Sequence, residues 1–304
     1  MNTSSHSAGN LWSAVLRQTA HALHCGALHP IQTSLTTVED GGVRFLIRQV
    51  SSLASLARKE KSADHGGPKA AANPFLPCDP DLFVTDISDN HFVLLNKFNV
   101  IDHHLLVVTR RFELQENLLN LADFSALVSC LAQFDGLGFY NGGPAAGASQ
   151  RHKHVQIVPV PLDAAHPVLP IEPLLAAAGT DRAVSTVHGL RFSHAFVRLD
   201  PTLATRPLEL ARHAFHAYLS LLDAAGIRAL DVNGEAQQSA PYNLLVTTRW
   251  MMLVPRCAER TEGIAVNALG FAGTLFVRDD TQRETIGRLG PMTVLQRVAA
   301  PMPA

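Results

Sequence analysis

Cysteine is scarce in this chain of 304 residues, and its cysteines are not paired in the sequence. The four are Cys25, Cys78, Cys130 and Cys257, and no two of them form a C-x-x-C unit. A disulfide framework or a zinc cluster in a short stretch of chain needs closely spaced ligands. The sequence therefore indicates neither kind of site, assigns no metal ligand, and favours a reducing cytosol.

A net charge of one sign is also missing, because 25 Lys and Arg oppose 26 Asp and Glu. A nearly neutral chain has no general attraction for nucleic acid or for acidic membranes. No apolar run reaches the roughly 20 residues that a membrane-spanning helix needs. Residues 1–10 lack the charged and apolar regions of a signal peptide. We therefore expect a soluble, cytoplasmic protein with no nucleic-acid or membrane partner.

The composition that remains, 47% apolar and 17% charged, is typical of a compact globular protein. Prolines at positions 161, 167, 170 and 173 mark a linker or an extended excursion. We expect an N-terminal segment over residues 8–165 and a C-terminal segment over 185–300 that packs against it.

Hydrophobic periodicity predicts the main elements. Helices are expected over 11–28, 114–134, 207–225, 279–289 and 292–298. Strands are expected over 43–50, 92–95, 105–109, 137–140, 152–160, 190–199, 243–247 and 251–255.

The most informative stretch joins a glycine-rich turn to residues 152–160, which alternate between polar and apolar side chains. Alternation at period two predicts a strand with two different faces. His152, His154 and Gln156 then project from one face, with neighbours about 6.5–7 Å apart. A strand histidine or a glycine-rich loop is common without a function, but together they indicate chemistry. Two imidazoles and an amide beside free backbone N–H groups can hold a polyphosphate against a nitrogen nucleophile.

Other charged and histidine residues have ordinary explanations. Residues 55–72 are rich in charge, glycine and alanine, which is typical of a solvated loop. His103 and His104 have no third ligand at a metal-binding spacing, and we assign them a structural role.

The stretch around His154 resembles the ATP adenylyltransferases, or diadenosine tetraphosphate phosphorylases, of the histidine-triad superfamily, whose site strand carries His-x-His-x-Gln. Other blocks of that family appear here in the same order. They are 73–77 (NPFLP), 91–100 (HFVLLNKFNV), 139–141 (FYN), 242–247 (YNLLVT) and 267–273 (NALGFAG). The resemblance spans most of the chain. It implies an α+β, histidine-triad-like fold with a mixed, largely antiparallel sheet backed by helices.

The resemblance also implies a reaction. Diadenosine tetraphosphate and phosphate would give ATP and ADP, reversibly, through an adenylylated His154. His152 matches the partner of the nucleophile on the same strand face. Gln156 stands where histidine-triad hydrolases carry a third histidine, and an amide cannot shuttle protons at neutral pH. That replacement suits transfer of the adenylyl group to phosphate rather than to water.

Substrate-binding positions follow from the same resemblance. Those that match the family's phosphate and ribose contacts are Asn141, Gly147, Ala148, Ser149, Gln150 and Gln156, and more loosely Asn243, Thr247 and Arg256. Lys97, after Asn96, and either Lys59 or Lys61 match cations near the polyphosphate. A Mg²⁺ ion can share this task when it is bound to the substrate rather than to a protein cage. No organic cofactor is expected.

Two alternatives stay open at this stage. A hexose-phosphate uridylyltransferase shares His-x-His-x-Gln, although this chain has Lys153 where that family places proline. A non-catalytic sensor of dinucleotides is the other. The acceptor, phosphate or sulfate, is also left open.

Overall fold

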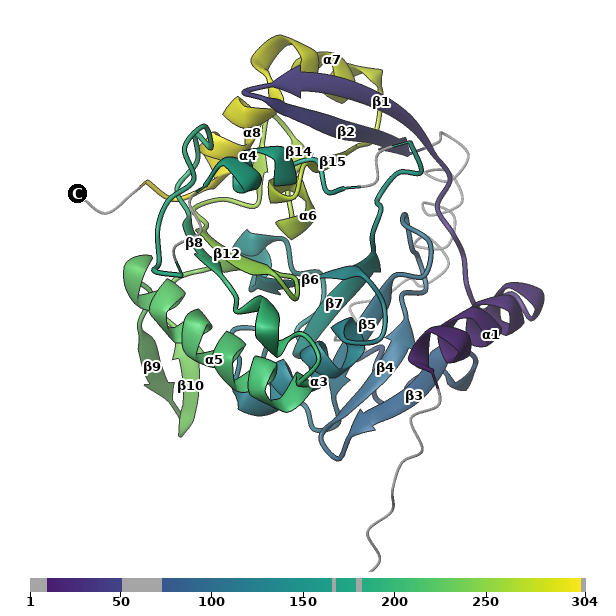
Figure 1. Ribbon diagram of the computed structural model, residues 1–304. Helices are drawn as coiled ribbons and strands as arrows, with labels where there is room; N and C mark the ends of the chain where they lie inside the picture. Colours follow the sequence, from purple (N-terminus) through teal and green to yellow (C-terminus); the bar gives the residue numbers. More distant parts are fainter. Residues whose placement is uncertain (1–9, 51–72, 166–167, 179–181, 302–304) are drawn as a thin grey trace, which may run out of the picture.

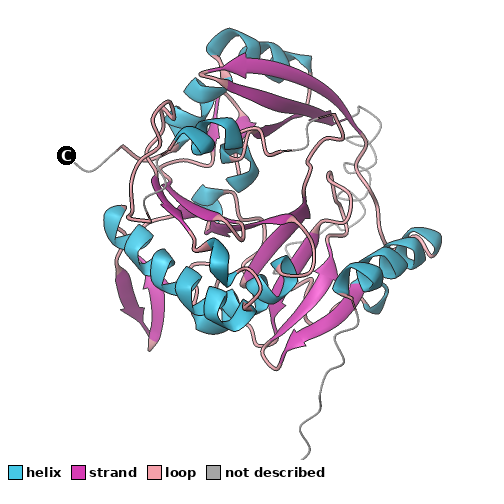
Figure 2. Ribbon diagram, viewed as in Figure 1, coloured by secondary structure: helices cyan, strands magenta, loops and turns pink. Residues whose placement is uncertain are grey.

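The computed structural model describes residues 10–50, 73–165, 168–178 and 182–301, and an eight-stranded sheet lies at its centre (Figures 1 and 2). The strands follow the order β3-β4-β5-β7-β6-β11-β12-β8, and each neighbouring pair is antiparallel. Their bounds are β3 Phe83–Ser88, β4 His91–Leu95, β5 Leu105–Thr109, β6 Gly136–Gly142, β7 His154–Pro159, β8 Ala195–Arg198, β11 Tyr242–Val246 and β12 Trp250–Pro255. Both expected segments contribute strands, and the division into 8–165 and 185–300 stays a prediction.

A smaller sheet lies beyond one face of the large one (Figure 1). It is formed by β1 Thr33–Asp40, β2 Val43–Val50 and β15 Thr274–Val277, with β15 parallel to β2. Two short pairs complete the strands of the described residues, β9 Ala229–Val232 with β10 Glu235–Gln238 and β13 Arg260–Thr261 with β14 Ile264–Ala265. One parallel pair among antiparallel ones confirms the expected mixed α+β fold.

Helices α3 Leu121–Leu131 and α5 Pro207–Ala224 cover the other face of the large sheet (Figure 1). The remaining helices of the described residues are α1 Leu11–His24, η1 Pro80–Leu82, η2 Pro144–Ala146, α4 Glu172–Ala177, η3 Pro201–Leu203, α6 Ala268–Phe271, α7 Asp280–Leu289 and α8 Pro291–Val298. The helices expected near the C-terminus are thus confirmed within a residue. Among the described residues, no helix combines the length and apolar character needed to cross a membrane.

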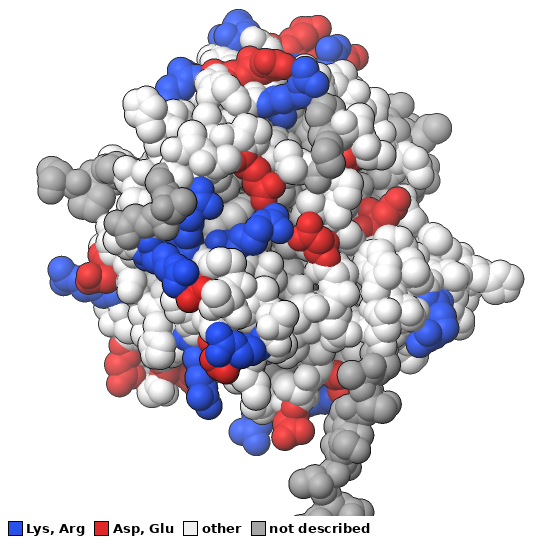
Figure 3. Space-filling view, viewed as in Figure 1, with Lys and Arg blue, Asp and Glu red and all other residues white. Residues whose placement is uncertain are grey.

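The alternation of β7 separates two cores. Val155 and Ile157 pack with α3 and α5, whereas Val158 packs on the opposite face with Phe139 of β6 and Leu245 of β11. On the outside, Lys and Arg side chains lie interspersed with Asp and Glu on the face shown in Figure 3. The helices therefore leave the histidine-bearing face of β7 to the layer formed by the small sheet.

The expected helix over 114–134 is wrong at both ends. Helix α3 begins only after Asn120, whose side chain accepts from the N–H groups of Ala122 and Asp123 in a capping box. The preceding residues form an irregular connector instead, with Leu114 in a β-bridge to His152 and a turn at 115–116. Leucines three or four apart fit a helix and a buried connector equally well, and the cap decides where the helix starts.

Three further boundaries differ from those expected. Strand β8 covers only the second half of 190–199, because the His194 ring accepts from the Val187 N–H and donates to the Phe192 carbonyl within a loop. Strand β7 starts at His154 instead of residue 152. Helix α1 stops at His24, four residues early, where Cys25 caps it.

Lys153, between the two histidines, is 1% exposed and points to the helix side of the sheet. Its ammonium lies 2.6 Å from Asp123 of α3 and 3.0 Å from Glu113. The other Asp123 oxygen accepts from Nε2 of His91 at 2.9 Å. These contacts hold the pKa of Asp123 below its ordinary value although burial alone would raise it. The lysine is therefore kept out of the histidine-bearing face, as the alternation predicts.

Replacing Asp123 with Ala should leave the Lys153 ammonium buried beside a single carboxylate. We expect the free energy of unfolding to fall by about 3–5 kcal/mol in urea denaturation. Asp86→Ala removes an exposed pair with Arg110 and should cost at most about 1 kcal/mol. Equal losses in the two variants would contradict a stabilising role for the buried pair.

Candidate active site

His154 is 4% exposed, and one of its ring nitrogens is hydrogen-bonded to the backbone just before its strand. Its Nδ1 lies 2.7 Å from the carbonyl oxygen of His152. Because a carbonyl only accepts, Nδ1 carries the proton and Nε2 keeps its lone pair. Burial lowers the pKa of His154 to about 4, although the hydrogen bond to the His152 carbonyl alone would raise it. The ring is therefore a neutral imidazole at pH 7, with no hydrogen bond to Nε2 from any described residue.

His152 has both ring nitrogens engaged. Nε2–H donates to the carbonyl oxygen of Thr109 at 2.8 Å, and Nδ1 accepts from the Asn73 amide at 3.0 Å. The ring of Phe75 packs against both histidines, with centroids 5.6 and 5.3 Å away. His152 thus lies beside His154, as expected, and holds it through its carbonyl group rather than through its ring.

Gln156 is oriented by a chain of two hydrogen bonds. The Asn96 amide donates to Nδ1 of His104 at 3.1 Å, which leaves Nε2–H of that ring to donate to Oε1 of Gln156 at 2.9 Å. Burial lowers the pKa of His104 to about 4, so this ring is also neutral. The oxygen of the Gln156 amide is occupied in this way, and its NH₂ group remains available as a donor.

A cavity of about 420 Å³ opens between this face and the layer that contains β2 and β15. Five of the expected site residues line it: Asn96, Asn141, Gly147, Ser149 and Gln156. Its charged lining residues are Glu259, Arg260 and Arg278. A hollow of about 560 Å³ among residues 186–194 and 296–301 contains none of the expected site residues.

The glycine-rich turn offers fewer free N–H groups than expected. The N–H groups of Gly143, Ala146, Gly147 and Ala148 donate to carbonyl oxygens within the turn itself. Those of Ser149 and Gln150 have no partner among the described residues. Gly147 has φ +91°, and a Cβ there would lie 3.0 Å from Asn267, so the glycine permits close approach of two chain segments. Among the described residues of this turn, Ser149 and Gln150 therefore have unpaired amides, whereas those of Gly143 and Gly147 are already bonded.

Arg256 is 2% exposed and acts as a structural cross-link, which corrects the expectation that it meets phosphate. Its guanidinium donates to the carbonyl oxygens of Ala146, Val266 and Val298. It also donates to the Asn243 side chain, which in turn donates to Oδ1 of Asn141 at 2.8 Å. Arg256 and Asn243 therefore support Asn141 in the cavity wall through hydrogen bonds, and their own polar groups are already paired.

The other expected residues that the structure describes, His152 and His154 included, are not among those that line the cavity. Thr247 closes the β11–β12 turn, where its hydroxyl accepts from the N–H of Trp250. Lys97 is at the surface, 3.5 Å from Asp79. Ala148 and Gln150 flank the lining residues in the chain. Lys59 and Lys61 fall outside the described residues.

Models of two known protein domains match this chain. The N-terminal domain model of the Ap4A phosphorylases matches residues 1–177, and the C-terminal domain model of the ATP adenylyltransferases matches residues 188–301. The chain belongs to the Ap4A phosphorylase (ATP adenylyltransferase) family. The resemblance read from the sequence is thereby confirmed.

Relatives in Saccharomyces cerevisiae match most of the chain. Diadenosine 5',5'''-P1,P4-tetraphosphate phosphorylase 2 is 28% identical over 78% of this chain and 78% of its own length. The protein APA1 is 26% identical over 84% of this chain and 83% of its own. The crystal structure of yeast Ap4A phosphorylase Apa2 superposes with a TM-score of 0.78 at 24% identity, covering 97% of this chain and 96% of that one. The fold is therefore shared with that enzyme.

Two site residues were missed by sequence reasoning. His104 received a structural role, yet it lines the cavity and orients Gln156. Gln115, 1% exposed, bridges the gap where β6 and β7 diverge. Its NH₂ group donates to the carbonyl oxygens of Asn141 and His154, and its Oε1 accepts from the His154 N–H at 2.9 Å. No local pattern marks either residue, because each acts on a strand that is distant in the sequence.

Gln115→Leu should release the backbone of His154. We expect kcat to fall roughly tenfold to a hundredfold with little change in KM, since an error of about 1 Å in a reacting group has this effect. Circular dichroism should show an intact fold. Gln18→Leu, which removes a hydrogen bond to Asp81 far from the cavity, is the matched control. A change confined to KM would argue against a positioning role for Gln115.

The two neutral histidines predict a loss of stability in mild acid. Their pKa is about 4 in the folded state and about 6.5 when unfolded, so the unfolded chain binds more protons between these values. The free energy of unfolding should therefore decrease as pH falls from 6.5 to 4, by on the order of 1–3 kcal/mol per histidine. In urea denaturation at several pH values, the double variant His104→Gln/His154→Gln should show a smaller decrease in the free energy of unfolding than the parent protein. A decrease of equal size would contradict the two assignments.

Proposed function

We propose that this protein is a nucleotidyltransferase that cleaves diadenosine tetraphosphate with phosphate to give ATP and ADP, reversibly. The observation that carries the proposal is the neutral His154 ring, whose Nδ1–H donates to the His152 carbonyl while Nε2 has no hydrogen-bond partner among the described residues. An imidazole in this state is a good nucleophile toward phosphorus. The family and the named activity of the yeast relative support diadenosine tetraphosphate as the substrate.

The reaction takes two displacements. The lone pair of His154 Nε2 attacks the phosphorus next to one adenosine, the bond to the bridging oxygen breaks, and ATP leaves with that electron pair. AMP remains on Nε2, and the Nδ1–H bond to the His152 carbonyl stabilises the positive charge on the ring. A phosphate oxygen then attacks the same phosphorus, the N–P bond breaks, and ADP leaves.

Gln156 favours phosphate over water as the acceptor. Its oxygen accepts from His104, so the NH₂ group can donate to a non-bridging oxygen of the transferred group. An amide does not gain or lose a proton near neutral pH, so it cannot activate water as a general base, as a histidine would.

Charge neutralisation falls to arginines at the cavity. Arg278 is exposed at the wall and has no ion pair among the described residues, whereas Arg260 pairs with Glu259 at 3.0 Å. Lys97 is a further candidate at the surface. Glu259 is the only acidic residue among the described lining residues, so the wall offers no carboxylate cage for a metal. We keep Mg²⁺ as an ion that arrives on the substrate.

Product analysis tests the proposal. Diadenosine tetraphosphate should yield ATP and ADP in equal amounts, only when phosphate is present. His154→Ala should abolish turnover, and His152→Ala should retain a trace. His188→Ala, in the hollow away from the site, is the matched control and should remain active. Binding without products would favour a sensor, and uridylyl transfer from a UDP-sugar would favour the uridylyltransferase alternative.

We also propose a cytoplasmic location. The four cysteines are free thiols, two of them exposed, which suits a reducing compartment.

A further inference from the structure

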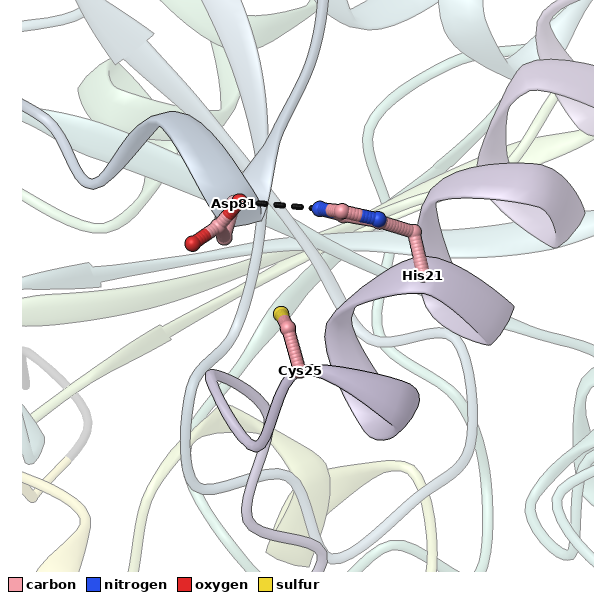
Figure 4. A group of neighbouring side chains, drawn as sticks. All are labelled: His21, Cys25 and Asp81. Atoms are coloured by element: carbon pink, nitrogen blue, oxygen red, sulfur yellow. Dashed lines mark hydrogen bonds and ion pairs between the residues drawn. The ribbon is translucent and has the colours of Figure 1, made fainter.

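Three side chains with metal-binding atoms meet between α1 and η1, away from the cavity (Figure 4). His21 and Cys25 come from the last turn of α1 and its cap, and Asp81 comes from η1. A spacing of four residues places the first two on one side of the helix. Figure 4 shows the Cys25 sulfur pointing toward the His21–Asp81 pair. Two segments distant in the sequence thus present a nitrogen, a sulfur and an oxygen to the same point.

The distances fit a tetrahedral ion after small side-chain movements. Nε2 of His21 lies 2.8 Å from Oδ1 of Asp81, and all three ligand atoms lie within 4.8 Å of one another. Zinc bonds of about 2.0–2.3 Å require ligand atoms roughly 3.3–3.8 Å apart. The His21 and Asp81 side chains are 52% and 48% exposed, so they can separate by about 1 Å without disturbing a packed core.

We propose that His21, Cys25 and Asp81 form a binding site for Zn²⁺, with water as the fourth ligand. A thiolate, an imidazole and a carboxylate are the donors that zinc prefers, whereas Mg²⁺ and Ca²⁺ prefer oxygen alone. The C-terminal end of a helix, where His21 and Cys25 lie, carries a partial negative charge that favours a bound cation. The Cys25 thiol has a weak contact at 3.7 Å to the Ala22 carbonyl, so coordination displaces little.

Binding replaces the proton on sulfur and the hydrogen bond between His21 and Asp81. The thiol proton passes to solvent, the Nε2 proton that donates to Asp81 is displaced so that the metal-bound ring carries its proton on Nδ1, and Nε2 takes the metal. Zinc affinity consequently increases with pH.

The ion would hold in place the start of the segment that runs from the end of α1 to Ile31 at the cavity. After Cys25, the N–H groups of His29 and Ile31 donate to the carbonyl oxygens of Lys97 and Asn99, both at 2.8 Å. Ile31 lines the cavity. Zinc therefore joins α1 to η1 at the start of a segment that forms part of the cavity wall.

Cobalt is the probe for this site, because a thiolate ligand gives Co²⁺ a charge-transfer absorption in the near ultraviolet. The reduced, metal-free, full-length protein should bind one equivalent of Co²⁺ with this band, and Zn²⁺ should displace it. Cys25→Ser should abolish the band, and His21→Ala should weaken binding by at least about tenfold. Cys257→Ser, at another exposed cysteine, should leave the band unchanged.

Thermal unfolding gives a second measurement. Zn²⁺ should raise the Tm of the parent and of Cys257→Ser but not that of Cys25→Ser. The proposal is overturned if the parent shows no thiolate band, if the band persists in Cys25→Ser, or if Zn²⁺ raises the Tm of all three proteins equally.

Discussion

The hydrogen bond from Nδ1–H of His154 to the carbonyl oxygen of His152 is the constraint on which this site depends. It places the proton on one nitrogen and leaves the other for phosphorus, while burial keeps the ring uncharged. Other contacts support this arrangement. Gln115 holds the His154 backbone on both sides, and Phe75 packs against the ring. A nucleophile in this setting needs no nearby base, because its reactive form is already present.

The same strand must keep a lysine out of the site. Lys153 lies between the two histidines, so a shift of register by one residue would exchange the two faces. The carboxylates that pair with the Lys153 ammonium, Asp123 and Glu113, lie on the helix-covered side of the sheet. Buried charge is costly unless it is paired. We infer that this ion pair specifies the register of β7 and thereby the direction of His154.

The alternation over 152–160 predicted the two faces of this strand correctly, because the faces of a strand follow from local sequence. It placed His154 and Gln156 together and Lys153 opposite, and the apolar stripe of α5 was equally clear. Contacts between distant segments could not be read in this way. Arg256 looked like a free cation, yet its partners come from three other parts of the chain. The spacing of the leucines after residue 114 likewise predicted a helix there. A buried connector can show the same spacing, so the spacing alone does not separate the two.

The most direct test of His154 as the nucleophile is to locate the covalent intermediate. The protein would be mixed with diadenosine tetraphosphate labelled at the adenylyl phosphorus, without phosphate, quenched in alkali, digested, and mapped by mass spectrometry. A His154 nucleophile predicts label on the peptide that contains this residue, attached at Nε2, and its transfer into ADP when phosphate is added before the quench. Label on another residue, or an active protein that never carries label, would contradict it.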